Sequence, residues 1–252
     1  MTVNYYEWCS HSSCENRALL FQSFRESTHA MQQVTEQLAS IAMEVSDSMQ
    51  PMGDRRFQML LEETSSQVIE MPPDGLCMFH ALAVGMQLHW DNLPNRAGVA
   101  AYLGSETVTT RNLFSVLAEI ANVHATAFPE DEVVQQVAES FRARPGGSAA
   151  WGTNDTLNHY IPPLTGTDVM VLNLSDMSQA EQVHATVYRP DGRVDTLVGA
   201  NINSYLSGSP HSLIMAFNGV DHWDLIVPEV LAQKAREMLR VMLESTNSQS
   251  KQ

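Results

Sequence analysis

One cysteine occupies a setting that suits nucleophilic chemistry. Cys77 follows a pair of prolines and the turn-forming dipeptide Asp74-Gly75, and a run of apolar, helix-favouring residues begins at it. This pattern predicts that Cys77 lies in the first turn of a buried helix, where the helix dipole would lower the pKa of its thiol. The unpaired backbone N–H groups of that turn would suit a developing oxyanion, and Gly75 would leave room for an incoming carbonyl. The alternative is that Cys77 is a small buried hydrophobic residue, as free cysteines commonly are.

A nucleophilic cysteine also requires an imidazole as base and a third group that orients it. Of the nine histidines, His222 has the most suitable surroundings, because it follows the loop 217–221 and begins a predicted strand. Side chains alternate along a strand, so His222 and Asp224 share one face and Trp223 points to the other. We interpret His222 as the general base and Asp224 as the residue that orients it. His80, one turn further along the cysteine's helix, is interpreted as a packing or supporting residue.

The elements that would position these residues are helices in the first part of the chain and strands in the second. Apolar residues three and four positions apart predict helices, and alternation or short apolar runs predict strands. A hairpin is expected at Pro190-Asp191-Gly192. Helices followed by a mostly antiparallel small sheet predict an α+β fold. The helices are predicted at 15–49, 55–64, from 77, at 94–103, 107–125, from 129 to between 142 and 147, from about 154, and at 228–243. The strands are predicted at 168–174, 183–189, 194–198, 211–217 and 222–227.

The composition argues against several kinds of partner. Lys and Arg number 14 against 29 Asp and Glu, and the net charge of −15 repels phosphate backbones, so we expect no nucleic-acid partner. No segment approaches the ~20 apolar residues that span a bilayer, so we expect no membrane insertion. Three cysteines cannot all pair with one another, which indicates a reducing, cytoplasmic compartment. Cys9, His11 and Cys14 lack a second pair of ligands, so we expect no metal site, and we expect no cofactor.

Three segments resemble motifs of one enzyme family. The segment PDGLCMFHAL, from Pro73 to Leu82, resembles the D-G-x-C-[L/M]-F-x-A-[L/I] signature of ovarian-tumour (OTU) domain cysteine proteases. The block 150–152, Ala-Trp-Gly, followed by a short helix and the strand 168–174, resembles the family's W-G block. His222-Trp223-Asp224 resembles its terminal H-aromatic-[D/N] motif. The three blocks stand in the family's order and together span about residues 67–227.

The resemblance implies a papain-like OTU fold and thiol-dependent cleavage of isopeptide bonds after the C-terminal glycine of ubiquitin. Cys77 matches the nucleophile, His222 the base and Asp224 the third member of the triad. Asp74 matches the acid that shapes the oxyanion loop. The implied partner is ubiquitin or polyubiquitin, whose tail arginines would be drawn to a surface of this net charge.

The chain departs from the family's pattern at two positions. Leu76 stands where the family has Asn, which we read as tolerable because backbone amides would form the oxyanion hole. His80 stands where the family has Arg, which removes a fixed charge beneath the site and puts the family's packing there in doubt. The residues expected to line the substrate channel have ordinary turn chemistry as their alternative explanation. They are Gly75, Leu76, Asn218, Gly219, Asp221 and Trp223.

The predicted organisation has three parts: a helical N-terminal extension at 1–66, an OTU-like catalytic domain at 67–228, and a C-terminal helix with a polar tail at 229–252. The helix 15–49 either packs on the catalytic domain or serves as an arm for a protein partner. The unusual extension suggests a bacterial or viral effector that acts in a host cytoplasm. Two alternatives remain open: a protease for another ubiquitin-like modifier or a viral polyprotein, and a catalytically silent ubiquitin-binding module.

Overall fold

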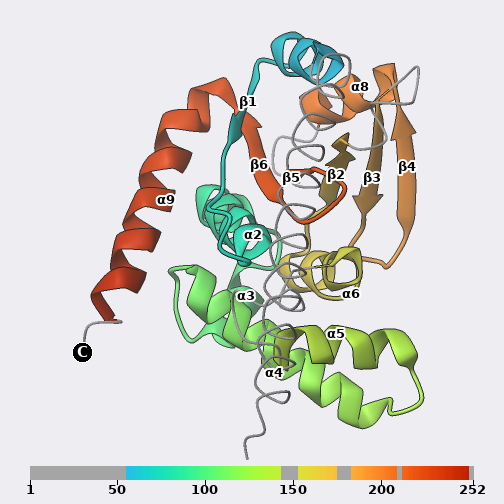
Figure 1. The fold of residues 1–252 in the computed structure, drawn as a ribbon, viewed down its shortest axis with the longest axis vertical. Helices are drawn as coiled ribbons and strands as arrows, with labels where there is room; N and C mark the ends of the chain where they lie inside the picture. The colour runs from blue at the N-terminus through green and yellow to red at the C-terminus, as the bar shows by residue number, and fades with distance from the viewer. Residues whose placement is uncertain (1–54, 143–152, 175–182, 209–211, 250–252) are drawn as a thin grey trace, which may run out of the picture. The chain divides into compact units, whose positions relative to one another are not determined.

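A mixed six-stranded sheet runs through the part of the chain that the computed structural model describes, residues 55–142, 153–174, 183–208 and 212–249 (Figure 1). The strand order is β1-β6-β5-β2-β3-β4. β2 and β5 run parallel, and the other neighbouring pairs are antiparallel. The predicted α+β fold with a mostly antiparallel sheet is therefore confirmed. The strands are β1 (Ser66–Ile69), β2 (Val169–Asn173), β3 (His184–Tyr188), β4 (Val194–Val198), β5 (Leu213–Phe217) and β6 (Trp223–Pro228).

Strand composition follows position in the sheet. The central strands β2 and β5 are continuous apolar runs, VMVLN and LIMAF, because both of their faces are covered. The edge strand β4 alternates between exposed and half-buried residues. The hairpin predicted at 190–192 joins β3 to β4, and the backbone N–H of Arg189 donates to the carbonyl of Arg193 at 3.0 Å. Gly192 takes a left-handed φ of 81° in this turn.

Helices cover both faces of the sheet (Figure 1). One core contains α2, α4, α6 and part of α9, and the other contains the helix 55–63 and α8. All described residues belong to one unit, which begins at Met52. The helices are α2 (Cys77–Leu88), α3 (Arg96–Leu103), α4 (Thr110–Ala127), α5 (Glu132–Arg142), α6 (Asn154–Thr165), α8 (Ala200–Gly208) and α9 (Glu229–Gln249), with a 3-10 turn, η1, at Trp90–Asn92.

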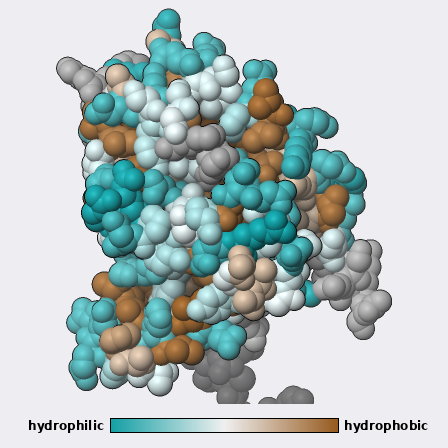
Figure 2. Space-filling view, turned by 180° about the vertical axis from the view of Figure 1, so that it is seen from behind, coloured by the Kyte–Doolittle hydropathy of each residue, from teal (hydrophilic) through white to brown (hydrophobic). Residues whose placement is uncertain are grey.

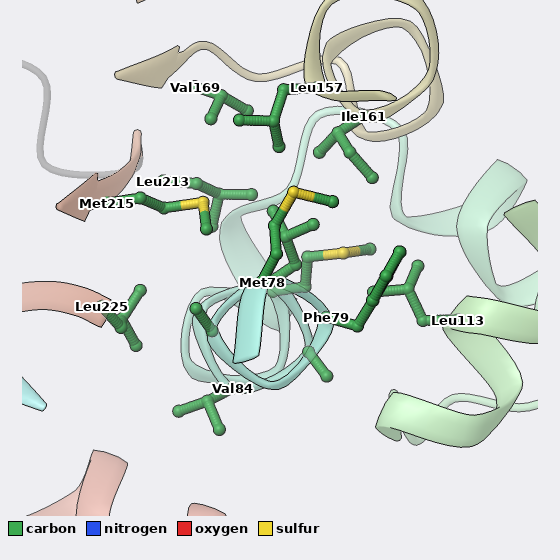
Figure 3. Close-up of a cluster of buried hydrophobic side chains, with 14 of the residues drawn as sticks. Met78, Phe79, Val84, Leu113, Leu157, Ile161, Val169, Leu213, Met215 and Leu225 are labelled. Atoms are coloured by element: carbon green, nitrogen blue, oxygen red, sulfur yellow. The ribbon is translucent and has the colours of Figure 1, made fainter. Parts of the chain in front are cut away.

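The central helix α2 is buried along nearly its whole length (Figure 3). Met78 and Phe79 pack among residues of the sheet and of neighbouring helices. A side chain at Gly85 would meet Leu213 Cδ2 at 3.0 Å and Leu225 Cδ1 at 3.2 Å, so glycine allows α2 to lie close against β5 and β6. This close approach sets the position of the start of α2 relative to β6.

One strand and one α-helix have no counterpart among the sequence-based predictions. β1 is only four residues long and forms by pairing with β6, from Ser66 opposite Pro228 to Ile69 opposite Leu225. α8 has the sequence ANINSYLSG, which is poor in helix formers, and the burial of Ile202 against the sheet stabilises it. Both elements depend on contacts with residues that are distant in the sequence, and such contacts leave no local periodic pattern.

The boundaries of the compact unit differ from the predicted domain limits at 66 and 228. Phe57, Leu60 and Leu61 of the helix 55–63 are buried in the core. Ala232 and Ala235 of α9 are buried in the other core, and α9 extends six residues beyond the predicted end at Leu243. The structural boundary falls between Pro51 and Met52. The predicted helix 15–49, Cys9, His11, Cys14 and the block 150–152 lie outside the described residues.

The surface is mainly hydrophilic on the face shown in Figure 2, with apolar residues in separate groups. Large exposed apolar side chains occur on several different elements, for example Tyr102, Phe128 and Val230. Scattered exposure of this kind is ordinary for a globular protein. Among the described helices, none has the length and hydrophobicity needed to cross a membrane.

Candidate active site

The turn before α2 places Cys77 at the first position of that helix, as predicted. Leu76 is the N-cap residue, and its side chain makes no capping bond. Asp74 secures the turn instead, since its Oδ1 accepts the backbone N–H of Leu76 at 2.9 Å. Gly75 adopts a φ of 78°, a left-handed conformation that favours glycine. The result is a tight turn whose carboxylate secures the start of the helix.

The thiol of Cys77 lies against the segment that contains His222. Its Sγ is 3.8 Å from the carbonyl oxygen of Asp221. The backbone N–H of Trp223 also acts on the sulfur, where it lowers the pKa of the thiol. Residues on both sides of His222 therefore contact Cys77, which joins two segments that are far apart in the sequence.

The pKa of Cys77 moves in the direction opposite to the sequence-based expectation. The residue is 3% exposed, and burial raises the pKa of its thiol above the ordinary value. Hydrogen bonds from the backbone N–H groups of Trp223 and Met78 favour the thiolate and offset part of this rise, whereas the charge of Asp74 adds to it. The expectation of a lowered pKa was wrong because desolvation outweighs the helix N-terminus.

The loop before His222 is a closed turn organised by Asn218. The side-chain Oδ1 of Asn218 accepts backbone N–H groups from Val220 at 2.9 Å, Asp221 at 2.9 Å and His222 at 3.0 Å. Its Nδ2 donates to Asp221 Oδ1 at 3.1 Å, and Gly219 has a φ of 85°. The side chain of Asn218 is thus engaged within the loop, which favours the turn-forming explanation of this residue over a direct substrate contact.

His222 and Asp224 lie together, as the alternation of the strand predicts. His222 Nε2 is 3.0 Å from Asp224 Oδ1, and both side chains are partly exposed, at 27% and 21%. The same Oδ1 accepts the backbone N–H of Met71 at 2.8 Å. Asp224 is therefore held by the chain segment that follows β1 as well as by the histidine. With Nε2 bonded to the carboxylate, Nδ1 of His222 is the ring nitrogen left for proton exchange with a thiol.

Trp223 has a structural position. Its side chain is 2% exposed, and its indole stacks on Phe217 with ring centroids 4.4 Å apart and an interplanar angle of 27°. A buried indole offers no surface to a substrate. The prediction that Trp223 lines the substrate channel therefore does not hold for its side chain. The stacked pair fixes the ends of β5 and β6, between which the loop of His222 extends.

His80 supports the turn that precedes α2. The residue is 3% exposed, its Nε2 lies 2.9 Å from Asp74 Oδ2, and its Nδ1 lies 2.8 Å from Thr110 Oγ1. The histidine that stands where the family has Arg contacts Asp74 directly. The sequence-based predictions did not include Thr110. It lies at the start of another helix, and no sequence pattern relates that position to residues 74–80.

The predicted site residues fall into two groups that meet at the sulfur. One group, on the turn 74–77, comprises Asp74, Gly75, Leu76 and Cys77; the other, on the loop and strand 218–224, comprises Asn218, Gly219, Asp221, His222, Trp223 and Asp224. Among the residues that the structure describes, no three or more His, Cys, Asp or Glu side chains form a group able to hold a metal ion. The arrangement provides a thiol, an imidazole and a carboxylate, the components of nucleophilic acyl chemistry.

Comparison with solved structures shows a distant likeness. No family model matches the chain, and no curated protein matches it. Among solved structures, the chain is similar to an OTU deubiquitinase from Wolbachia pipientis wMel, with 13% sequence identity and a TM-score of 0.38. The match covers 66% of this chain and 90% of that one.

Proposed function

We propose that this protein is a thiol-dependent deubiquitinase that cleaves isopeptide bonds after the C-terminal glycine of ubiquitin. The observation that carries the proposal is the contact of the Cys77 sulfur with residues 221 and 223 on either side of His222, whose Nε2 is bonded to Asp224. The motifs around Cys77 and His222, which resemble those of OTU proteases, supply the substrate class.

In the proposed reaction, His222 acts as a general base. Burial raises the pKa of Cys77, so the thiol is mainly protonated at neutral pH. Nδ1 of His222 accepts the thiol proton while the sulfur attacks the carbonyl carbon of the terminal glycine. Asp224, itself held by the N–H of Met71, keeps Nε2 protonated and stabilises the imidazolium that forms.

The negative oxygen of the tetrahedral intermediate would be held by backbone N–H groups at the first turn of α2. The N–H of Leu76 is occupied by Asp74, which leaves the N–H of Cys77 as the main candidate donor. Collapse of the intermediate breaks the C–N bond, and the imidazolium returns its proton to the leaving lysine amine. Water, deprotonated by His222, then hydrolyses the thioester and regenerates the thiol.

The charge of the protein suits the proposed substrate. The net charge is −15, and the half-exposed carboxylate of Asp74 lies at the turn before Cys77. The arginines in the tail of ubiquitin would be attracted to such a surface. Gly75 and Leu76, together with Gly219 and Asp221, are the residues we propose to border the diglycine tail.

Cleavage of a panel of diubiquitins tests the proposal, with Cys77→Ala as the control. We expect the wild-type chain to cleave at least one linkage and to be labelled at Cys77 by ubiquitin bearing a C-terminal electrophile. Probes made from other ubiquitin-like modifiers distinguish ubiquitin from a different modifier as substrate. Lack of both cleavage and labelling, with ubiquitin binding that Cys77→Ala leaves unchanged, would favour a silent binding module and contradict the proposal.

A further inference from the structure

The buried side chain of His80 connects the turn before Cys77 with the start of α4, and the proposed reaction does not use this side chain. His80 lies on α2 one turn after the nucleophile, and its two ring nitrogens contact Asp74 and Thr110 at 2.9 and 2.8 Å. Asp74 belongs to the turn before Cys77, and Thr110 is the first residue of α4. The ring therefore links the start of α4 to the turn that carries the proposed oxyanion site.

Asp74 uses both of its carboxylate oxygens at this turn. Oδ1 accepts the N–H of Leu76, and Oδ2 faces His80 Nε2. The side chain of Asp74 is 45% exposed, whereas that of His80 is 4% exposed. A half-exposed carboxylate can rotate into solvent unless a fixed group holds it, and the packed imidazole is such a group.

The hydrogen-bonding pattern also selects the tautomer of the neutral His80 ring. A carboxylate only accepts hydrogen bonds, so Nε2 carries the proton that it donates to Asp74. Nδ1 is then an acceptor, and the hydroxyl of Thr110 is its donor. Thr110 is 6% exposed, so this hydroxyl is held within the protein as well.

We propose that His80 is a positioning residue for the turn 74–77, and that Thr110 holds it in the tautomer that donates to Asp74. The inference rests on the proposed function, because the turn positions the N–H of Cys77 for the oxyanion. His80 does not touch the substrate or exchange its proton in the reaction. Its contribution is to keep the backbone of the turn in the geometry needed by the transition state, where a displacement of about 1 Å can cost roughly 100-fold in rate.

Two amide substitutions separate the two contacts of His80. In His80→Gln the side-chain NH₂ can reach the place of Nε2 and retain the contact with Asp74. In His80→Asn the amide reaches only the place of Nδ1, so the contact with Thr110 can persist while that with Asp74 is lost. We expect His80→Asn to lower kcat for diubiquitin about 10- to 100-fold with KM changed less than about twofold, and His80→Gln to recover most of the rate.

A second pair of variants tests the role of Thr110 and guards against loss of folding. Thr110→Val removes the hydroxyl at nearly constant volume, and Thr110→Ser retains it. We expect Thr110→Val to lower kcat about 3- to 10-fold and Thr110→Ser to stay close to wild type. Thermal unfolding of each variant shows whether it is folded at the assay temperature.

Hydrogen–deuterium exchange provides a readout that does not depend on the substrate. His80→Asn should raise amide exchange in residues 75–77 at least several-fold, whereas His80→Gln should raise it less. Equal exchange in wild type and His80→Asn, or equal losses of kcat in the Gln and Asn variants, would overturn the inference. If the wild-type chain cleaves no ubiquitin substrate, the proposed function fails, and the exchange comparison still decides whether His80 holds the turn.

Discussion

Polar groups gather at both ends of the central strands, and the two clusters differ in the side chain that pairs with the carboxylates. At the end near Cys77, carboxylates pair with histidines, Asp74 with His80 and Asp224 with His222. At the opposite end, where β2 and β5 begin, Arg189 pairs with Asp168 and Asp195. A guanidinium keeps its charge at every relevant pH, whereas an imidazole can gain and lose a proton near neutrality.

The Arg189 cluster has the features of a structural network. Arg189 Nη1 donates to Asp168 Oδ2 at 2.9 Å, and its Nε donates to Asp195. The hydroxyl of Tyr205 donates to the same oxygen of Asp168 at 2.8 Å, and burial raises the pKa of Tyr205 well above its ordinary value. These groups join β3, β4 and α8 to the start of β2. The comparison teaches that a fixed charge fastens the sheet at one end, whereas carboxylate–histidine pairs lie at the end with the candidate site, and only the His222 pair takes part in the proposed proton transfer.

The largest effect is expected for His222→Ala. Removing the imidazole leaves the buried thiol without a base, so the rate of diubiquitin cleavage should fall by roughly 10³- to 10⁴-fold. Because His222 is partly exposed and the loop is held by Asn218, the melting temperature should change little. Steady-state cleavage and thermal unfolding check this, and substantial activity in the variant would remove His222 from the mechanism.

A smaller effect is expected for Asp224→Asn. The amide oxygen can still accept the N–H of Met71, but the amide no longer stabilises an imidazolium at His222. We expect kcat to fall about 10- to 100-fold with little change in stability, and Asp224→Ala should add a loss of about 1 kcal/mol because the Met71 N–H loses its partner. Cleavage rates and urea unfolding measure the two effects. Full activity in Asp224→Asn would show that orientation alone suffices.

The pH dependence of Cys77 alkylation tests the protonation of the thiol at the end of the sheet where the carboxylate–histidine pairs lie. The pKa of Cys77 is raised by burial, so the reactive thiolate should become predominant only above the ordinary thiol value of about 8.5. The rate of iodoacetamide modification, followed by mass spectrometry, should therefore still rise with pH above that value. A plateau reached below pH 7 would mean that Cys77 and His222 form a thiolate–imidazolium pair in the free enzyme.

Substitution of Arg189 by Met should separate stability from activity. Asp168 and Asp195 would lose their fixed cation, and since all three groups are partly exposed we expect a loss of only about 1 kcal/mol in the free energy of unfolding. Cleavage of diubiquitin at a temperature where the variant is folded should stay within about twofold of wild type. A large fall in kcat would show that the two ends of the sheet are coupled.

The smallest effect is expected for Cys9→Ser and Cys14→Ser. Both residues lie outside the described part of the chain, and the sequence predicts neither a catalytic role nor a metal site for them. Cleavage by the double variant should equal that of wild type within error, with unchanged labelling of Cys77 by an electrophilic ubiquitin. Loss of activity would assign the N-terminal segment a part in the site.

Much of the local structure around the site follows from short sequence patterns. The Asp74-Gly75 turn with its apolar continuation predicts the helix that starts at Cys77, and the H-x-D spacing predicts the contact of His222 with Asp224. The Pro190-Asp191-Gly192 turn predicts the β3–β4 hairpin. Each of these features depends on residues only a few positions apart, so the preferences of the backbone and the period of the side chains are sufficient.

Other properties of the site arise only when distant segments pack together. The pairing of β1 with β6 brings the N–H of Met71 to Asp224, and the packing of α4 against α2 brings Thr110 to His80. Burial by the surrounding elements reverses the expected direction of the pKa shift of Cys77. Local sequence encodes backbone preference, but desolvation and long-range hydrogen bonds depend on which surfaces meet in the folded protein.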